Sequence, residues 1–291
     1  MLLYQFIDTS FTSLSCDESS SDEIEHKLNH DLEMVHIWLN ANKLTLNRKK
    51  TEYMIIGSRQ RLNLVSDDTN INIGNESITR VQAKNVLGII IDEQLKWHEH
   101  NDKQCKTISS RIGLLRRARD FVTQDILKTM YNSLVLPHFN YCSTVWHNFS
   151  VEHIDKLYKL QKRAARVITR SNYDIRSSQI FTLLDWRPIN ENLDKQELVI
   201  TFKAQLGLVP NYLTQLFNLN NNINHQLRSN NRSLYIPKPR TNFLKNSFSY
   251  RGAVSWNNLP HNIIDRAITG NMSLSSFKNS LTNMSVLEKV T

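Results

Sequence analysis

Residues 152–170 read EHIDKLYKLQKRAARVITR, and this stretch predicts a helix with two contrasting faces. Its apolar side chains recur at the helical period and would face a protein core: Leu157, Leu160, Ala164, Val167 and Ile168. Its cations recur in steps of 3, 4, 3 and 4 and would share another face: Lys156, Lys159, Arg163, Arg166 and Arg170. Lys162 widens that cationic face.

The charge of this predicted helix favours a polyanionic partner. No acidic residue occurs between Lys156 and Arg170, whereas solvent-exposed helices usually mix acids with bases. A second basic cluster precedes it and consists of Arg111, Arg116, Arg117 and Arg119. We expect these cations to contact the phosphates of RNA or DNA, with little dependence on base sequence. The alternative is an ordinary solvated helix surface.

The rest of the composition is that of a globular protein with a basic bulk. The 291 residues carry a net charge of +9, but residues 1–35 are acidic at −7, so the remaining residues carry +16. Only 7 Gly and 6 Pro occur, which argues against a collagen-like chain and a turn-dense β-sandwich. Neither common glycine-rich nucleotide-binding loop is present. The longest apolar run, residues 86–91, is too short to cross a membrane.

The cysteines and histidines predict neither disulfides nor a metal site. Three widely spaced cysteines, Cys16, Cys105 and Cys142, are typical of an intracellular protein, cytoplasmic or nuclear rather than secreted. A structural zinc site needs four ligands in paired short spacings. Two groups of His and Cys side chains have short spacings, but neither supplies two such pairs: His98, His100 and Cys105, and His138, Cys142 and His147.

Patterns before and after the central helix predict an α+β fold, with β structure before residue 100 and mostly helix after it. A capping box at 20–23 begins a helix that ends at 40–42. Strands at 53–56, 71–73 and 78–81, with a turn at 74–75, and a strand at 86–91 that is buried on both faces, predict one small antiparallel sheet. Further helices are predicted at 108–121 and at 125–136, where Pro137 would end the helix, and an Asn-rich loop near 218–231.

Short segments, in order along the chain, resemble the reverse transcriptases of non-LTR (LINE-like, jockey/CR1-like) retrotransposons. LYQFIDTSF at 3–11 is similar to the family's L-Y-A-D-D-T-S segment. WLNANKLTLN at 38–47 and KTEYM at 50–54 are similar to W-x-x-x-N-x-L-x-L-N followed by K-T-x-x-M. Residues 86–100 resemble F-L-G-x-x-I-D-x-x-L-x-W-x-x-H, and LQKRAAR at 160–166 and the tail at 240–260 continue the resemblance.

The resemblance implies a fragment of a polymerase in four parts. These are a partial palm at 1–58, a primer-grip-like β-hairpin region at 59–100, a helical thumb-like region at 101–175 and a C-terminal extension at 176–291. The fingers, an earlier palm strand and an endonuclease would then precede Met1.

The resemblance also implies that this chain is not an active polymerase. Family members hold two Mg²⁺ ions through an aspartate of the earlier palm strand and the first aspartate of Y-A-D-D. Ile7 stands at the second of these positions, and a hydrocarbon side chain cannot ligate magnesium, so Asp8 is a lone remnant. We therefore expect no catalytic residue, metal or cofactor. Lys50 matches a family lysine near the incoming nucleotide.

Three interpretations of the function remain open at this stage. The chain is a reverse-transcriptase fragment that retains RNA or DNA binding through its basic helix, or a decayed reading frame without a selected activity, or part of an active polymerase whose other half lies elsewhere. None of them requires a membrane or a small-molecule substrate.

Overall fold

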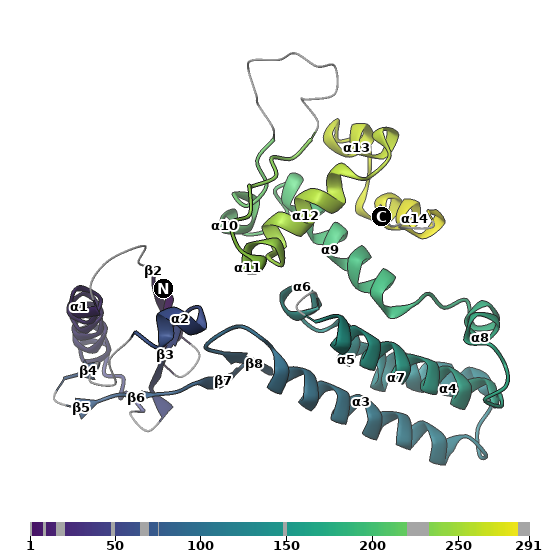
Figure 1. Ribbon diagram of the computed structural model, residues 1–291, viewed down its shortest axis with the longest axis horizontal. Helices are drawn as coiled ribbons and strands as arrows, with labels where there is room; N and C mark the ends of the chain where they lie inside the picture. Colours follow the sequence, from purple (N-terminus) through teal and green to yellow (C-terminus); the bar gives the residue numbers. More distant parts are fainter. Residues whose placement is uncertain are drawn as a thin grey trace. The chain divides into compact units, whose positions relative to one another are not determined.

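The computed structural model describes residues 2–7, 10–15, 21–47, 50–64, 70–74, 76–147, 150–219 and 233–284 (Figure 1). Helices make up more than half of the described residues and the strands form small sheets, which confirms a mixed α+β class. The chain divides into two compact units, residues 1–103 and residues 104–291. The strands that the structure describes all lie in the first unit, and the described elements of the second unit are helices.

The first unit is built on a four-stranded sheet. Its strands, in spatial order, are β2 (Ser10–Ser15), β1 (Leu2–Ile7), β3 (Glu52–Ile56) and β6 (Thr79–Arg80). β1 is antiparallel to both neighbours, whereas β6 runs parallel to β3 after a crossover that contains α2 (Arg59–Leu62). The predicted helix is confirmed as α1 (Ser21–Ala41), and its proposed cap at Ser20 lies outside the described residues.

Side chains of α1 and of β3 form the core of this unit. Leu28 and Leu32 of α1 are fully buried against Tyr53 and Ile55 of β3. The amide of Asn29 fixes the next strand, because its Nδ2 donates to the Asn70 carbonyl at 2.9 Å and its Oδ1 accepts from the Asn72 backbone N–H at 2.8 Å. One helix therefore organises both the sheet and the hairpin beside it.

The strands at 71–92 correct the prediction of a single antiparallel sheet. One of them, β6, joins the four-stranded sheet in parallel with β3. The other four form two separate hairpins: β4 (Asn72–Ile73) with β5 (Glu76–Ser77), and β7 (Ala83–Val86) with β8 (Ile89–Asp92). The run at 86–91 is thus not one buried strand. It turns at Leu87 and Gly88, which have positive φ angles of 49° and 89°, the backbone of a two-residue hairpin turn. Leu87 is 69 % exposed as a result.

The end of β8 leads directly into the first helix of the next unit. The Asp92 carboxylate accepts from the backbone N–H groups of Gln94, Lys96 and Trp97 at 3.1, 3.0 and 2.7 Å. These bonds close a loop that places Trp97 in the core at 3 % exposure, immediately before α3 (His98–Ala118). Asp92 and Trp97, which match the family motif at 86–100, therefore have a structural role in this protein: they shape the loop before α3.

Seven helices are described in the second unit up to residue 205, and the first of them, α3, already begins at His98. They are α3, α4 (Gln124–Leu134), α5 (Leu136–Asn140), α6 (Ser143–Trp146), α7 (Val151–Thr169), α8 (Ser177–Leu184) and α9 (Ile189–Gln205). Two predictions need correction. The helix predicted to reach Phe121 ends at Ala118, so Phe121 lies in the turn after α3 and is 87 % exposed. Pro137 does not end α4. It occupies the first turn of α5, where a missing N–H costs nothing.

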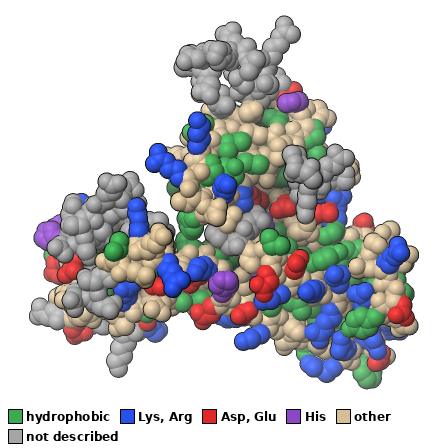
Figure 2. Space-filling model, in the orientation of Figure 1, with side chains coloured by type: hydrophobic (Ala, Val, Ile, Leu, Met, Phe, Trp, Pro, Cys, Tyr) green, Lys and Arg blue, Asp and Glu red, His purple; other side chains and the backbone are tan. Residues whose placement is uncertain are grey.

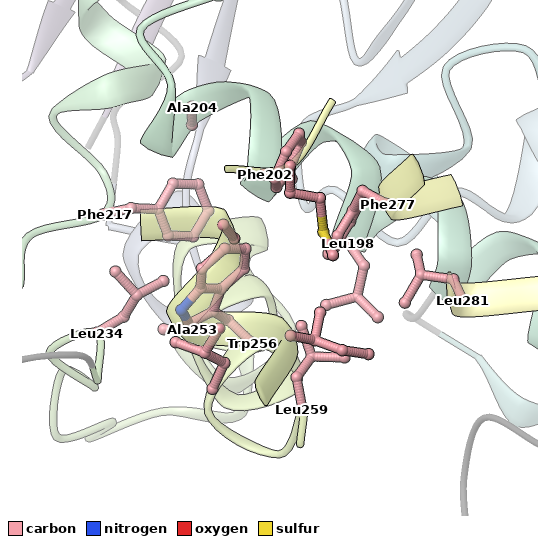
Figure 3. Close-up of a cluster of buried hydrophobic side chains, with 14 residues drawn as sticks. Leu198, Phe202, Ala204, Phe217, Leu234, Ala253, Trp256, Leu259, Phe277 and Leu281 are labelled. Atoms are coloured by element: carbon pink, nitrogen blue, oxygen red, sulfur yellow. The ribbon is translucent and has the colours of Figure 1, made fainter. Parts of the chain in front are cut away.

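Five further helices complete this unit around α9. They are α10 (Asn211–Thr214), α11 (Asn242–Lys245), α12 (Phe248–Asn257), α13 (His261–Ile268) and α14 (Leu274–Asn283). Their core centres on Phe202, Trp256 and Phe277, and the rings of Phe202 and Phe277 stack with centroids 4.2 Å apart (Figure 3). Of the predicted Asn-rich loop, residues 220–231 lie outside the described residues.

Candidate nucleic-acid interface

The predicted central helix is confirmed as α7, to within one residue at each end. Its N-cap is Ser150, whose side chain accepts from the His153 backbone N–H at 3.3 Å. It ends because Arg170 adopts the left-handed conformation, with φ of 55°, and donates its N–H to the Arg166 carbonyl. Arg170 therefore lies immediately after the helix rather than within its last turn.

One face of α7 is fixed in the interior of the unit. Leu157, Ala164 and Ile168 are completely buried, and Leu160 at the edge is half-buried. Two hydrogen bonds of buried polar side chains also orient the helix. His153 Nε2 lies 3.1 Å from Gln104 Oε1, and Gln161 Nε2 donates to the Arg187 carbonyl at 2.8 Å. Because these contacts fix the rotation of the helix about its axis, the cations lie on the opposite face. Lys156, Lys159 and Arg170 are exposed there, and Lys162, Arg163 and Arg166 are half-buried.

The two lysines nearest the start of α7 differ in their surroundings. Lys156 is exposed and pairs with Glu152 at 3.0 Å, so its charge is partly offset. Lys159 is also exposed, one turn further along the helix. Lys162, half-buried, lies over the ring of Tyr158 at 4.3 Å from its centroid. The cationic character of the helix therefore begins at Lys159 rather than at Lys156.

The three arginines each hold another segment in place. Arg163 Nη1 donates to Ser109 Oγ of α3 at 3.0 Å. Arg166 Nη2 donates to the Ile175 carbonyl at 3.3 Å, in the loop after α7. Arg170 Nη2 donates to the carbonyls of Arg119 and Val122 at 2.7 and 3.0 Å, in the turn between α3 and α4. These acceptors are neutral, so the contacts position the guanidinium groups without cancelling their charge.

The bond to Ser109 decides which cations of α3 join this surface. Arg116 follows Ser109 by seven residues, so both lie on the same flank of α3, next to α7. Arg117 is its exposed neighbour in the last turn. Arg111 is two residues from Ser109, about 200° around the axis, and lies on another side of α3. The structure thus brings Arg116, but not Arg111, to the flank that α7 occupies.

We define the basic face by the exposed and half-buried cations of α7, of the residue that follows it and of the end of α3: Lys159, Lys162, Arg163, Arg166, Arg170, Arg116 and Arg117. Figure 2 shows Lys and Arg side chains gathered at the lower right of the view, over α3, α4 and α7. Acidic residues also occur at its edges: Glu152 and Asp155 near the start of α7, Asp174 in the loop after α7, and Asp120 in the α3–α4 turn. Asp120 pairs with Arg119 at 3.1 Å. Cations in the last turns of α3 and α7 also complement the helix dipoles.

The remaining residues singled out from the sequence lie elsewhere. Lys50 is exposed in the first unit, directly before β3, and its N–H donates to the Asn47 carbonyl at 3.0 Å. Asp8 lies outside the described residues. His100 is buried with Nδ1 at 3.4 Å from the Ile90 backbone N–H, and burial, with a smaller effect of Lys103, lowers its pKa to about 4. Within the described ranges, no group of three or more His, Cys, Asp or Glu side chains could hold a metal ion.

A buried ionic cluster in the second unit was not predicted from the sequence. Arg251 Nη2 of α12 lies 2.8 Å from Glu197 Oε2 of α9, and His147 Nε2 lies 3.6 Å from the same oxygen. Glu197 is only 2 % exposed, so burial raises its pKa to about 7, while Arg251 opposes this shift and Asp194 adds to it. These partners are far apart in the sequence and carry no common motif. The cluster joins α6, α9 and α12.

Comparison with known proteins identifies no relative. No family model, curated protein or solved structure matches this chain. Among the residues that the structure describes, no helix is both long enough and apolar enough to span a membrane.

Proposed function

We propose that the helical unit binds RNA or DNA, with little dependence on base sequence, through the basic face. The observation that carries the proposal is the combination of charge and geometry on α7. Five cations occur between Lys159 and Arg170 without an acid among them, and the three arginines are positioned by neutral acceptors. Such an array matches a phosphate backbone, because phosphate contacts position a protein without reading bases.

An electrostatic mode of binding follows from this arrangement. Each cation that neutralises a phosphate releases a condensed counterion, so the affinity falls as salt rises. The contact of Arg163 with α3 also gives the surface width, since it places Arg116 of α3 on the flank next to α7. Both helices therefore present cations to one ligand.

We propose further that the chain derives from a non-LTR reverse transcriptase and has no polymerase activity of its own. The ordered motifs at 3–11, 38–54 and 86–100 support this descent, and Ile7 at the position of a metal-binding aspartate supports inactivity. A primer-extension assay with Mg²⁺ or Mn²⁺ tests the second point. We expect no template-dependent incorporation above a control without protein, and incorporation that is lost in Asp8→Ala would contradict the proposal.

The binding proposal is tested with a variant that breaks no contact described above. Lys159, Arg116 and Arg117 are exposed, so the triple change Lys159→Gln, Arg116→Gln and Arg117→Gln removes three cations and should keep the fold. Fluorescence anisotropy with a labelled 20-nucleotide strand measures affinity across a salt series. We expect the slope of log affinity against log salt to flatten by roughly 2, from about 0.7 per phosphate contact.

A matched control removes the same charge from another region. Lys238, Arg240 and Lys245 are exposed near α11, apart from α3 and α7 within the same unit (Figure 1). Changing these three to glutamine should leave the salt slope as in the parent. If both triple variants flatten the slope equally, binding follows net charge and not the basic face. If the parent protein does not bind the labelled strand at all, the result contradicts the binding proposal and favours the interpretation of the chain as a decayed reading frame.

A further inference from the structure

The C-terminal end of α7 also exposes aromatic rings, and their position is unusual. Among the described residues, Phe121 and Tyr173 are the most exposed aromatic side chains, at 87 % and 81 %. They come from different segments, the α3–α4 turn and the loop after α7. Single exposed apolar side chains are common on protein surfaces, but these two lie beside the same helix end and the same cations.

Each ring is placed next to an arginine of the basic face. The Arg166 guanidinium lies over the Tyr173 ring, 5.3 Å from its centroid. Phe121 lies between Arg119 and Val122 in the sequence, and Arg170 binds the carbonyls of both at 2.7 and 3.0 Å. Each of the two exposed rings therefore lies close to a positive charge at this end of the helix.

The turn that presents Phe121 is held in place from both sides. Its own N–H donates to the Ala118 carbonyl at 3.0 Å, and Arg170 holds the two flanking carbonyls. A hollow of about 400 Å³ lies between this turn and the end of α7, and Phe121, Ile168 and Arg170 are among the residues that line it. A ring on a fixed turn loses little conformational freedom when a ligand stacks on it.

We infer that Phe121 and Tyr173 form a stacking platform and that the basic face therefore takes single-stranded nucleic acid in preference to duplex. Unpaired bases can stack on exposed aromatic rings while the cations follow the phosphates, whereas the bases of a duplex are already stacked on one another. Every base has a flat aromatic face, so stacking of this kind is tolerant of sequence. The inference rests on the proposed function and adds the class of strand.

The experiment compares three labelled ligands of equal length at matched salt: oligo(dT), an abasic strand with the same phosphates, and a duplex. The parent should bind oligo(dT) at least tenfold more tightly than the abasic strand. The double variant Phe121→Ala, Tyr173→Ala should lose that preference, by about fivefold or more for each ring. Its affinity for the abasic strand and for duplex, and its salt slope, should stay as in the parent, because stacking is not ionic.

Two further variants test whether the loss of the preference for oligo(dT) is specific to Phe121 and Tyr173. Tyr212→Ala with Phe243→Ala removes two aromatic rings that are 67 % and 51 % exposed elsewhere in the unit and should keep the preference. Phe121→Trp with Tyr173→Trp retains stacking and should restore it. Equal affinity of the parent for oligo(dT) and the abasic strand, with a normal salt slope, would overturn the platform but leave the proposed function intact. Absence of any salt-dependent binding by the parent would overturn both.

Discussion

Two sets of arginines in the helical unit show how their partners determine their role. Arg251 is buried at 12 % side-chain exposure and pairs with the Glu197 carboxylate at 2.8 Å. Arg163 and Arg170 reach a hydroxyl and backbone carbonyls instead, at the surface. In the first case a negative charge compensates the guanidinium, and the pair belongs to the interior. In the second case the hydrogen bonds are satisfied while the charge remains available to an external anion.

The largest effect expected from this comparison is on stability. Arg251→Met removes one member of the buried pair and leaves Glu197 without its countercharge, which should lower the free energy of unfolding by about 3–5 kcal/mol. Chemical denaturation of the parent and the variant measures the difference. Adding Glu197→Leu should recover much of the loss, since two apolar side chains need no countercharge. A loss below about 1 kcal/mol in the single variant would show that the pair is not the compensating contact described here.

A second prediction concerns the pH dependence of the same pair. The pKa of Glu197 is raised to about 7 in the folded protein, above its ordinary value of 4.5, so the folded state binds this proton more tightly than the unfolded chain does. Its contribution to stability is therefore complete below about pH 4.5 and is lost as the pH rises through 7. We expect the unfolding free energy of the parent, relative to Glu197→Gln, to fall by roughly 1–3 kcal/mol between pH 5 and 8. Parallel profiles of the two proteins would refute this assignment.

The smallest effect separates the hydrogen bond of Arg163 from its charge. Ser109→Ala removes the acceptor but keeps the guanidinium, so stability should fall by about 1 kcal/mol or less and the salt slope of binding should not change. Arg163→Gln removes the charge and should flatten that slope by about 0.7 to 0.9. Anisotropy titrations of both variants check this. Equal flattening in both would mean that the position of the guanidinium, rather than its charge alone, limits binding.

The sequence predicts α7 well because the signal is local. Apolar and cationic residues alternate at the helical period over 19 residues, and neither face depends on distant parts of the chain. The same reasoning fails at 86–91, where a continuous apolar run conceals a turn at Leu87 and Gly88. A run of this kind predicts burial but gives no sign of where the chain reverses.

The contacts that build the candidate site are not encoded in neighbouring residues. Arg163 reaches Ser109 across 54 positions, and Arg251 pairs with Glu197 across the same number. Both arginines look alike in the sequence, although one is structural and the other is part of the basic face. Only the tertiary packing of α3 against α7 and of α9 against α12 distinguishes them. The exposure of Phe121 was missed for a similar reason, since its helix ends three residues earlier, at Ala118.

Arg170, whose left-handed conformation ends α7, limits how many phosphates of a ligand this helix can contact. From Lys159 to Arg170 the axis rises about 16 Å, at 1.5 Å per residue. A strand with the geometry of duplex DNA advances about 3.4 Å per phosphate, so this distance spans about five of its phosphates, as many as the five cations from Lys159 to Arg170. An unstacked single strand advances further per phosphate and places fewer phosphates along the same distance. Beyond Arg170 the chain turns away, and a longer strand gains no further phosphate contact from this helix. The part of the footprint that α7 contributes is thus determined by a single backbone conformation.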